Sequence, residues 1–213
     1  EAMDTAEDAR AYDAMDHRAV NEAFVDRVLE VWGVRHDPRV LDMGCGTAQI
    51  PIVLARRRPD ARIVATDLAR HMLDVGAENL RVAGVAGRVE LRLADCKALD
   101  FPDGAFDLAI SNSLVHHLPE PTPALREAAR VVRPGGAIVF RDLLRPESHD
   151  EVARIVATYA AGADAVQRDL FRASLCAALT LDELRDVAAA AGLAAAHVYR
   201  SSDRHFTLEV ASA

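Results

Sequence analysis

The sequence predicts an α/β fold built on a doubly wound, mostly parallel sheet. Between residues 39 and 143, short apolar runs alternate with amphipathic helical segments, which implies parallel strands joined by right-handed crossovers. Near the C-terminus the pattern changes to two short strands, 195–200 and 205–210, joined by a polar turn. We therefore expect a parallel sheet that ends in an antiparallel hairpin.

Five apolar runs precede that hairpin as predicted strands: 39–43, 62–66, 89–94, 106–111 and 137–143. The segments with helical spacing between and after them are 48–57, 68–82, 123–132 and 180–191. The last helix has a capping-box start, with Thr180 as N-cap and Glu183 three residues later. The residues 133–136, Arg-Pro-Gly-Gly, predict a turn before the fifth strand.

Composition limits the class of protein. The 213 residues suit a single domain, 1–213, with a full core, and a formal net charge of −8 lacks the basic excess of a nucleic-acid-binding protein. Three cysteines cannot all pair and lack metal-ligand spacing, so we expect reduced thiols and no metal site. We see no membrane span and no signal peptide at the start of the sequence, so a cytoplasmic protein is expected.

Two segments lie outside the alternating pattern. Residues 1–32 have helical spacing and are expected to pack on the sheet or to cover a ligand there. Residues 144–180 leave the carboxyl end of the fifth strand, and they either cover the site or pack as a pair of core helices. The expected apolar faces are Ala19, Val20, Ala23, Phe24, Val28 and Leu29 in the first segment, and Val152, Ile155, Val156, Tyr159, Leu170, Phe171 and Leu175 in the second.

A glycine loop follows the first strand and opens a helix, so a small ligand can reach bare backbone at a helix N-terminus. Dinucleotide-binding loops need glycines at the first, third and sixth positions, but here Gly44 and Gly46 are followed by Gln49. Asp42 precedes the loop, where its charge would repel a pyrophosphate. S-adenosylmethionine has an ammonium, a sulfonium and no phosphate, so it suits this loop better. An NAD(P)-dependent oxidoreductase is the disfavoured alternative.

The stretch from Leu41 to Ala48 resembles the first motif of the class I S-adenosylmethionine-dependent methyltransferases, hydrophobic-hydrophobic-Asp-x-Gly-x-Gly-x-Gly/Ala. The resemblance covers nearly the whole chain from about residue 20. It implies a Rossmann-like, seven-stranded sheet whose last strand inserts antiparallel. Residues 106–118, the fourth strand and its loop, resemble the small-molecule branch, similar to quinone-biosynthesis methyltransferases. The Asn/Asp-Pro-Pro-aromatic motif of many amine-methylating nucleic-acid enzymes is absent, which disfavours a nucleic-acid substrate. The expected partner is therefore a small-molecule acceptor.

Five polar residues fall at the carboxyl ends of the first five strands, where ligands bind in such sheets: Asp42, Asp67, Asp95, Asn112 and Asp142. Asp67 follows Gly44 by 23 residues, a separation that suits a carboxylate bound to ribose hydroxyls. The alternative is that Asp67 caps the turn that follows it.

The resemblance assigns the remaining cofactor contacts. Leu68 is expected against one adenine face, and Asp95 with the Cys96 backbone at the adenine edge. Asn112 is expected at the amino-acid end of the cofactor or at the substrate, and Asp42 at the loop and, through water, at the ammonium. The loop of Gly44, Cys45 and Gly46 is expected against the methionine part.

Candidate catalytic residues are fewer, because an activated methyl donor mainly needs alignment and exclusion of water. A base is needed only where the acceptor loses a proton. Of His116 and His117, we favour His117 as that base and expect the other histidine to be structural, satisfied by backbone. The resemblance also places Tyr12 near the methyl donor, although a surface tyrosine is an equal alternative. A monomer or homodimer is expected, and a non-catalytic S-adenosylmethionine-binding module remains a further alternative.

Overall fold

The computed structural model describes residues 5–33 and 35–211 of the chain. Within these ranges the strands form one seven-stranded sheet, in the order β3-β2-β1-β4-β5-β7-β6. The first five strands are parallel, and β7 runs antiparallel to both β5 and β6. The predicted fold class is confirmed. The strands are β1 (Arg39–Met43), β2 (Arg62–Asp67), β3 (Val89–Leu93), β4 (Phe106–Asn112), β5 (Val132–Leu143), β6 (His197–Arg200) and β7 (His205–Val210).

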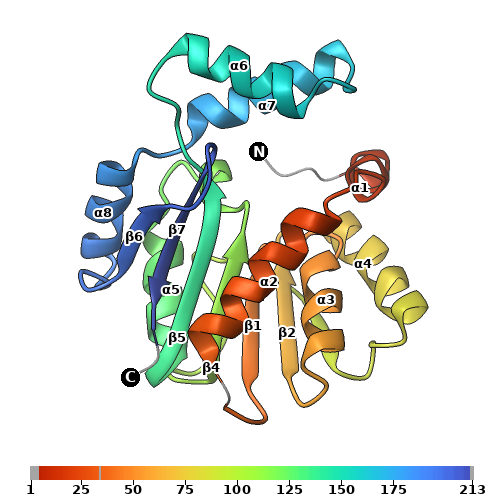
Figure 1. The fold of residues 1–213 in the computed structure, drawn as a ribbon. Coiled ribbons are helices and arrows are strands. Elements are labelled where there is room, and N and C mark those ends of the chain that lie inside the picture. The colour runs from red at the N-terminus through yellow and green to blue at the C-terminus, as the bar shows by residue number, and fades with distance from the viewer. Residues whose placement is uncertain (1–4, 34, 212–213) are drawn as a thin grey trace.

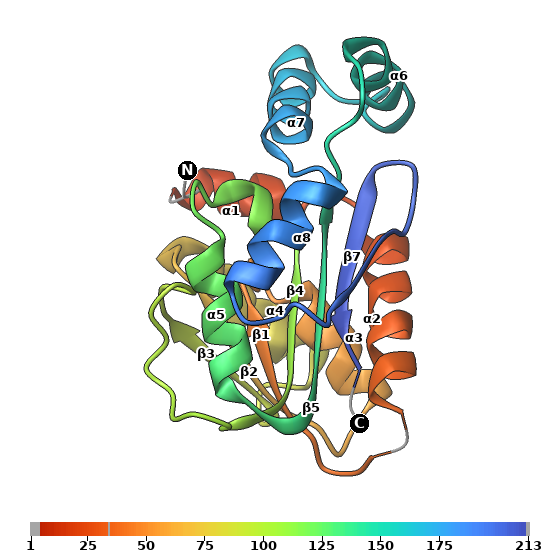
Figure 2. The same ribbon diagram turned by 90° about the vertical axis from the view of Figure 1, so that its left-hand side faces the viewer.

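Helices cover both faces of the sheet (Figures 1 and 2). On one face α2 and α3 contribute Phe24 and Leu54 to a core cluster, and on the other α5 and α8 contribute Leu125 and Leu184 to a second cluster. The helices are α1 (Ala6–Asp13), α2 (Arg18–Trp32), α3 (Gln49–Arg57), α4 (Arg70–Ala83), α5 (Thr122–Val131), α6 (His149–Tyr159), α7 (Ala165–Ala177) and α8 (Leu181–Ala190), with the 3-10 turn η1 (Val115–His117). None of the described helices has the length and apolar character needed to cross a membrane.

The central strands show why the sequence folds in this way. Along β5, Ile138 and Phe140 belong to the cluster under α5 and α8, while Val139 belongs to the cluster under α2 and α3. A strand buried on both faces needs a continuous apolar run, which is the pattern that predicted it. The polar residues that end these strands are therefore left at the carboxyl edge of the sheet.

The N-terminal segment differs from the expected single stripe. Residues 6–32 form two helices, and the buried side of α2 consists of Asn21, Phe24, Val25, Val28 and Trp32. Ala19 and Ala23 are exposed, because the stripe is rotated toward Val25 and Trp32. Residues 1–4 of the expected 1–32 cover lie outside the described residues.

The Arg-Pro-Gly-Gly stretch does not form a turn before the fifth strand. It lies inside β5, where the register with β4 shifts between Phe106 and Leu108 and Gly135 has φ +73°. A Cβ on Gly136 would lie 2.6 Å from the Asp107 carbonyl oxygen, so the strand passes too close for any side chain. The capping box at Thr180 and Glu183 forms as predicted.

Helices α6 and α7 lie beyond the carboxyl ends of the strands, apart from the two layers that cover the sheet (Figures 1 and 2). They pack on each other through a separate cluster that includes Ile155, Val156 and Leu175, and Leu143 of β5 joins it. Tyr159 and Leu170, which we expected on the apolar faces, are 46% and 62% exposed. The pair therefore does not belong to the main core.

Candidate active site

The loop after β1 has the backbone conformation that its glycines predict. Gly44 and Gly46 have φ of +73° and +54°, and the Gly44 and Cys45 N–H groups both donate to the Thr66 carbonyl, at 2.8 and 2.9 Å. A Cβ on Gly44 would lie 2.9 Å from Leu114 Cδ1. Gly44 is therefore required both for its left-handed φ and for the approach of the loop after β4.

Asp67 anchors this loop to β2. Its Oδ2 accepts from the Gly46 N–H at 2.8 Å, and its Oδ1 accepts from the Ala69 N–H at 2.9 Å. The second contact is the kind expected if Asp67 caps the turn that follows it. Helix α4 begins just after this turn, at Arg70. Leu68, between them, is 56% exposed and leaves an apolar side chain uncovered beside the loop.

Asp42 lies at the centre of the sheet edge and is 1% exposed. Burial, and then the charge of Asp67, raise the pKa of its carboxyl to about 8. Its Oδ2 atom is buried without a hydrogen-bond partner among the described residues. The loop N–H groups donate to Thr66 and Asp67, and the expected role of Asp42 in ordering the loop stays a prediction.

Tyr12 lies over the glycine loop at the end of α1. Its Cε1 would be 3.6 Å from a Cβ on Gly46, and burial, followed by the charges of Asp67 and Asp42, raises the pKa of its hydroxyl. The structure thus brings Tyr12, Asp42 and Asp67 together.

A polar clamp holds α1 in this position. Asp13 Oδ1 accepts from Gln49 Nε2 and from Asn79 Nδ2, each at 2.8 Å, and Asn79 also donates to the Thr47 carbonyl. The sequence alone did not predict this clamp, because Gln49 was interpreted only as the residue that replaces the third glycine of a dinucleotide-binding loop. The available signal was Asp13 directly after Tyr12.

After β3, Asp95 Oδ1 accepts from both the backbone N–H and the ammonium of Lys97, each at 2.9 Å. These hydrogen bonds lower the pKa of the Asp95 carboxyl. The Cys96 thiol is buried in the core cluster, and burial raises its pKa to about 11. The side chain of Cys96 therefore packs in the core, and the expected contact of its backbone with adenine stays a prediction.

Asn112, at the end of β4, is not free. Its Oδ1 accepts from Arg141 Nε at 2.8 Å, and its Nδ2 donates to Ser113 Oγ at 3.2 Å. Arg141 also donates to the Val20 carbonyl of α2 and lies over the Phe24 ring, 4.9 Å from its centroid. Sequence reasoning missed Arg141, since one arginine in an apolar strand has no spacing signal.

Asp142 does not belong to the ligand edge, contrary to expectation. It is fully buried, and it accepts from the Val115 N–H at 2.5 Å, the Leu143 N–H at 2.6 Å and His116 Nδ1 at 2.5 Å. Because side chains alternate along β5, Asp142 points to the opposite face from Arg141 and positions η1. His116 is thus held by a carboxylate, not by backbone as predicted.

His117 differs from its neighbour in having an exposed ring. Partial desolvation by the surrounding protein, and then the charge of His116, lower the pKa of His117 to about 4. Its imidazole is therefore neutral at pH 7, and the low pKa makes it a weak base unless a bound acceptor changes its surroundings. Within the described residues, no group of histidine, cysteine and acidic side chains is arranged to hold a metal ion.

Comparison with known proteins agrees with this geometry. Residues 41–140 match the family model described as "Methyltransferase domain". The chain is 31% identical over 135 residues to methyltransferase GfsG of Streptomyces halstedii, covering 63% of this chain and 48% of that protein. It is 32% identical over 142 residues to the ubiquinone/menaquinone biosynthesis C-methyltransferase UbiE of Enterobacter sp. strain 638, covering 65% of this chain and 57% of that one.

These matches support a class I S-adenosylmethionine-dependent methyltransferase. The fold of a methyltransferase from Methanococcus maripaludis matches all of this chain and 94% of that one, with a TM-score of 0.76 at 17% identity. The chain spans about half the length of the curated relatives that it matches. Neither the oxidoreductase nor the non-catalytic alternative finds support here.

The residues present fit the cofactor of this methyltransferase family, S-adenosylmethionine. Asp42 and Asp67 lie near each other at the glycine loop, and neither forms an ion pair with an arginine or lysine among the described residues. A buried carboxyl with an unpartnered oxygen is costly unless a ligand compensates it. The two positive groups of the cofactor are such a ligand, and a pyrophosphate is not.

Proposed function

We propose that this protein transfers a methyl group from S-adenosylmethionine to a small-molecule acceptor by in-line displacement. The observation that carries the proposal is the buried Asp42 carboxyl, whose Oδ2 has no hydrogen-bond partner among the described residues and which lies next to Asp67. Such a site favours a cationic, phosphate-free nucleoside. When bound, the cofactor supplies a methyl group that its sulfonium already activates.

The residues proposed to hold the cofactor follow the edge of the sheet. Asp42 neutralises the ammonium through water, and Asp67 accepts from the ribose hydroxyls. Leu68 covers one adenine face, and Asp95 with the Cys96 backbone binds its edge. Asn112 holds the amino-acid end, and the loop of Gly44, Cys45 and Gly46 contacts the methionine part.

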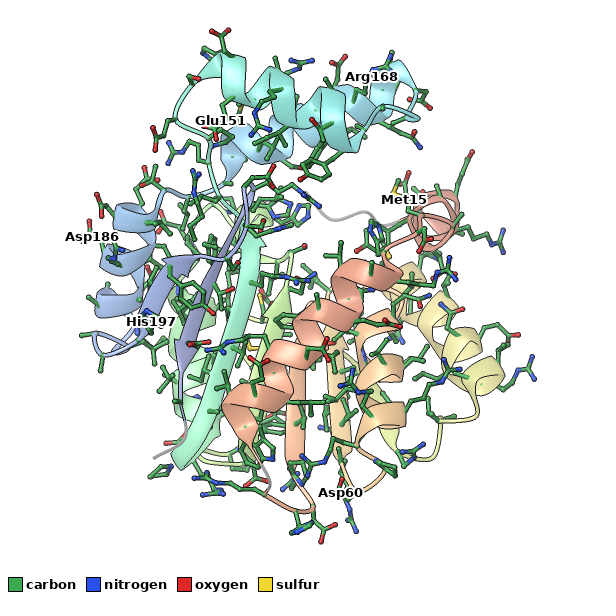
Figure 3. All side chains as sticks on the ribbon, viewed as in Figure 1. Met15, Asp60, Glu151, Arg168, Asp186 and His197 are labelled. Atoms are coloured by element: carbon green, nitrogen blue, oxygen red, sulfur yellow. The ribbon has the colours of Figure 1, made fainter. Side chains whose placement is uncertain are left out.

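The covers exclude water and position the acceptor. In this proposal, residues 1–32 close over the cofactor with Tyr12 beside the reacting centre, and residues 144–180 close over the acceptor, within a single domain 1–213. Met15, between α1 and α2, is 42% exposed and projects at the end of the molecule that carries α6 and α7, opposite Asp60 (Figure 3). An exposed apolar side chain here suits an acceptor with an apolar body.

His117 is proposed as the base for an acceptor that loses a proton. The bond from sulfur to methyl breaks, the bond from acceptor to methyl forms, and the acceptor's proton passes to His117. We expect His117→Ala to lower turnover at least tenfold while the affinity for S-adenosylhomocysteine stays within twofold. Equal losses of stability and activity would show a structural role instead. Because His116 is held by Asp142, H116A is the comparison variant that should lose stability.

A thermal shift with separate titrations of S-adenosylmethionine, S-adenosylhomocysteine and NADH tests the cofactor. A ligand at about 100 times its Kd adds roughly 2.7 kcal/mol of stability, which raises the Tm by a few degrees. We expect both adenosyl compounds to stabilise and NADH to have no effect. Stabilisation by NADH alone would contradict the proposal.

We also propose that the protein acts in the cytoplasm as a monomer or homodimer, without a nucleic-acid partner. All three cysteines, Cys45, Cys96 and Cys176, are unpaired, which suits a reducing compartment. The net charge of −8 disfavours binding to a polyanion.

A further inference from the structure

A cluster of nitrogen-bearing side chains lies at the carboxyl ends of β4 and β5 and at the amino end of the antiparallel strand β7. The cofactor assignments leave its cationic residues without a role. Arg141 pairs in register with Asn112 on one side and Thr207 on the other, and Leu143 pairs with His205. Side chains alternate along strands, so Arg141 and His205 are diagonal neighbours on the same face of the sheet. That face is the one covered by α2, whose Val20 carbonyl accepts from Arg141.

Arg204 completes the cluster from the turn before β7. Its backbone carbonyl accepts from the Leu144 N–H at 2.8 Å, and its guanidinium lies 3.4 Å from the centroid of the Tyr159 ring of α6. The side chain is 17% exposed. The cluster therefore lies between the sheet edge and the α6–α7 cover.

The positive charge of Arg141 is not balanced by an ion pair, since no carboxylate among the described residues lies within ion-pair distance of it. Asp203 is 3.5 Å from Arg204 but also accepts from the Tyr159 hydroxyl, and Asp142 lies on the other face of β5, bound by His116.

The positive charges of Arg141 and Arg204 repel each other. Burial, followed by the charge of Arg204, lowers the pKa of Arg141 to about 10. Burial, followed by Arg141 and Arg204, lowers the pKa of His205 to about 4, and its Nδ1 is bonded to Ser202 Oγ at 2.9 Å. The two half-buried guanidiniums repel each other, although the chain as a whole has a net charge of −8. A bound anion would stabilise this arrangement.

We propose that the methyl acceptor carries a carboxylate, which Arg141 binds with Arg204 and His205 beside it. This inference rests on the proposed function, because it assigns the acceptor of the same site. Arg141 donates through Nε to Asn112 and through Nη2 to the Val20 carbonyl, each at 2.8 Å. Its Nη1 has no hydrogen-bond partner among the described residues and is available to an anion. The carboxylate of the cofactor's methionine part has the same chemistry, so a test must separate these two sources.

The test uses benzoate as the probe and benzamide as its neutral counterpart, each titrated calorimetrically into the protein saturated with S-adenosylhomocysteine. We expect benzoate to bind at least tenfold more tightly than benzamide. Arg141→Gln should weaken benzoate at least tenfold and leave S-adenosylhomocysteine within twofold, and Arg141→Lys should restore part of the loss. Arg204→Gln gives a second variant that keeps the contacts of Arg141 with α2. Arg200→Gln, exposed at the end of β6 in the same hairpin, is the matched control and should change nothing.

Two outcomes would overturn the inference. Equal binding of benzoate and benzamide would show that no anion site exists. If Arg141→Gln weakens S-adenosylhomocysteine but not 5′-methylthioadenosine, which lacks the amino-acid part, the anion is the cofactor's own carboxylate. Failure of the wild type to bind S-adenosylhomocysteine would instead be a failure of the proposed function.

Discussion

Asp42 shows how far a single residue can depart from its ordinary chemistry. A carboxyl in water titrates near pH 3.9, but burial beside Asp67 raises the pKa of Asp42 to about 8. Without a ligand, the folded protein holds this proton at neutral pH. A cation at the site favours the ionised form, so binding of S-adenosylmethionine should release the proton.

Replacing Asp42 tests this ionisation. A carboxyl whose pKa is raised in the folded state stabilises the protein below its unfolded pKa, and this stability is lost as pH rises toward about 8. In the wild type this lowers the free energy of unfolding by up to about 1.4 kcal/mol per pH unit between pH 5 and 7, and we expect this decrease to be absent in Asp42→Asn. Urea denaturation of both proteins without ligand, at pH 5, 6 and 7, measures the difference. Identical slopes would mean that the Asp42 pKa is ordinary.

For helices and strands, the sequence predicted their positions in the chain better than the contacts between them. The strand runs and the capping box of α8 were predicted within a few residues, because apolar periodicity and cap chemistry are local. The division of the N-terminal segment into α1 and α2 was not predicted. Asp13 bonds with Gln49 and Asn79, which lie 36 and 66 residues away, and no local pattern encodes such contacts.

The Asp13 clamp should control the docking of α1. Asp13→Ala leaves two amide donors without their acceptor, at a cost of about 1 kcal/mol each. We expect the substitution to speed hydrogen exchange in α1 more than in α4. We also expect a several-fold weaker affinity for S-adenosylhomocysteine, since Tyr12 then leaves the loop. Glu7→Ala, exposed on the same helix, is the control. Unchanged exchange in α1 would show that its apolar contacts suffice.

For the whole molecule, the two core clusters share one sheet. Strand β5 contributes to both, so neither layer can unfold while the other stays intact. The α6–α7 pair has its own small cluster, to which the sheet contributes Leu143. Local opening of this pair therefore costs less than global unfolding.

Unfolding experiments test this organisation. Trp32 is the only tryptophan and is 3% exposed in the α2 layer, so its fluorescence reports that layer. We expect its urea transition to coincide with far-ultraviolet circular dichroism, as for one cooperative unit. Limited proteolysis under native conditions should cut first between α6 and α7, near residues 160–164. Two separated transitions would contradict a single domain.

The sequence by itself determined the class of fold, the glycine loop and the acidic residues at the strand ends, since these depend on period, backbone freedom and residue type along short stretches. It also placed Tyr12, Asp42 and Asp67 in one proposed site. Only the tertiary structure decided that Asp142 faces η1 and that Asp13 clamps α1. It also decided that Arg141 lies near Arg204 with no described carboxylate within ion-pair distance of Arg141. The physical reason is that strand alternation assigns a side chain to a face, but its partners there come from distant segments that only folding brings together.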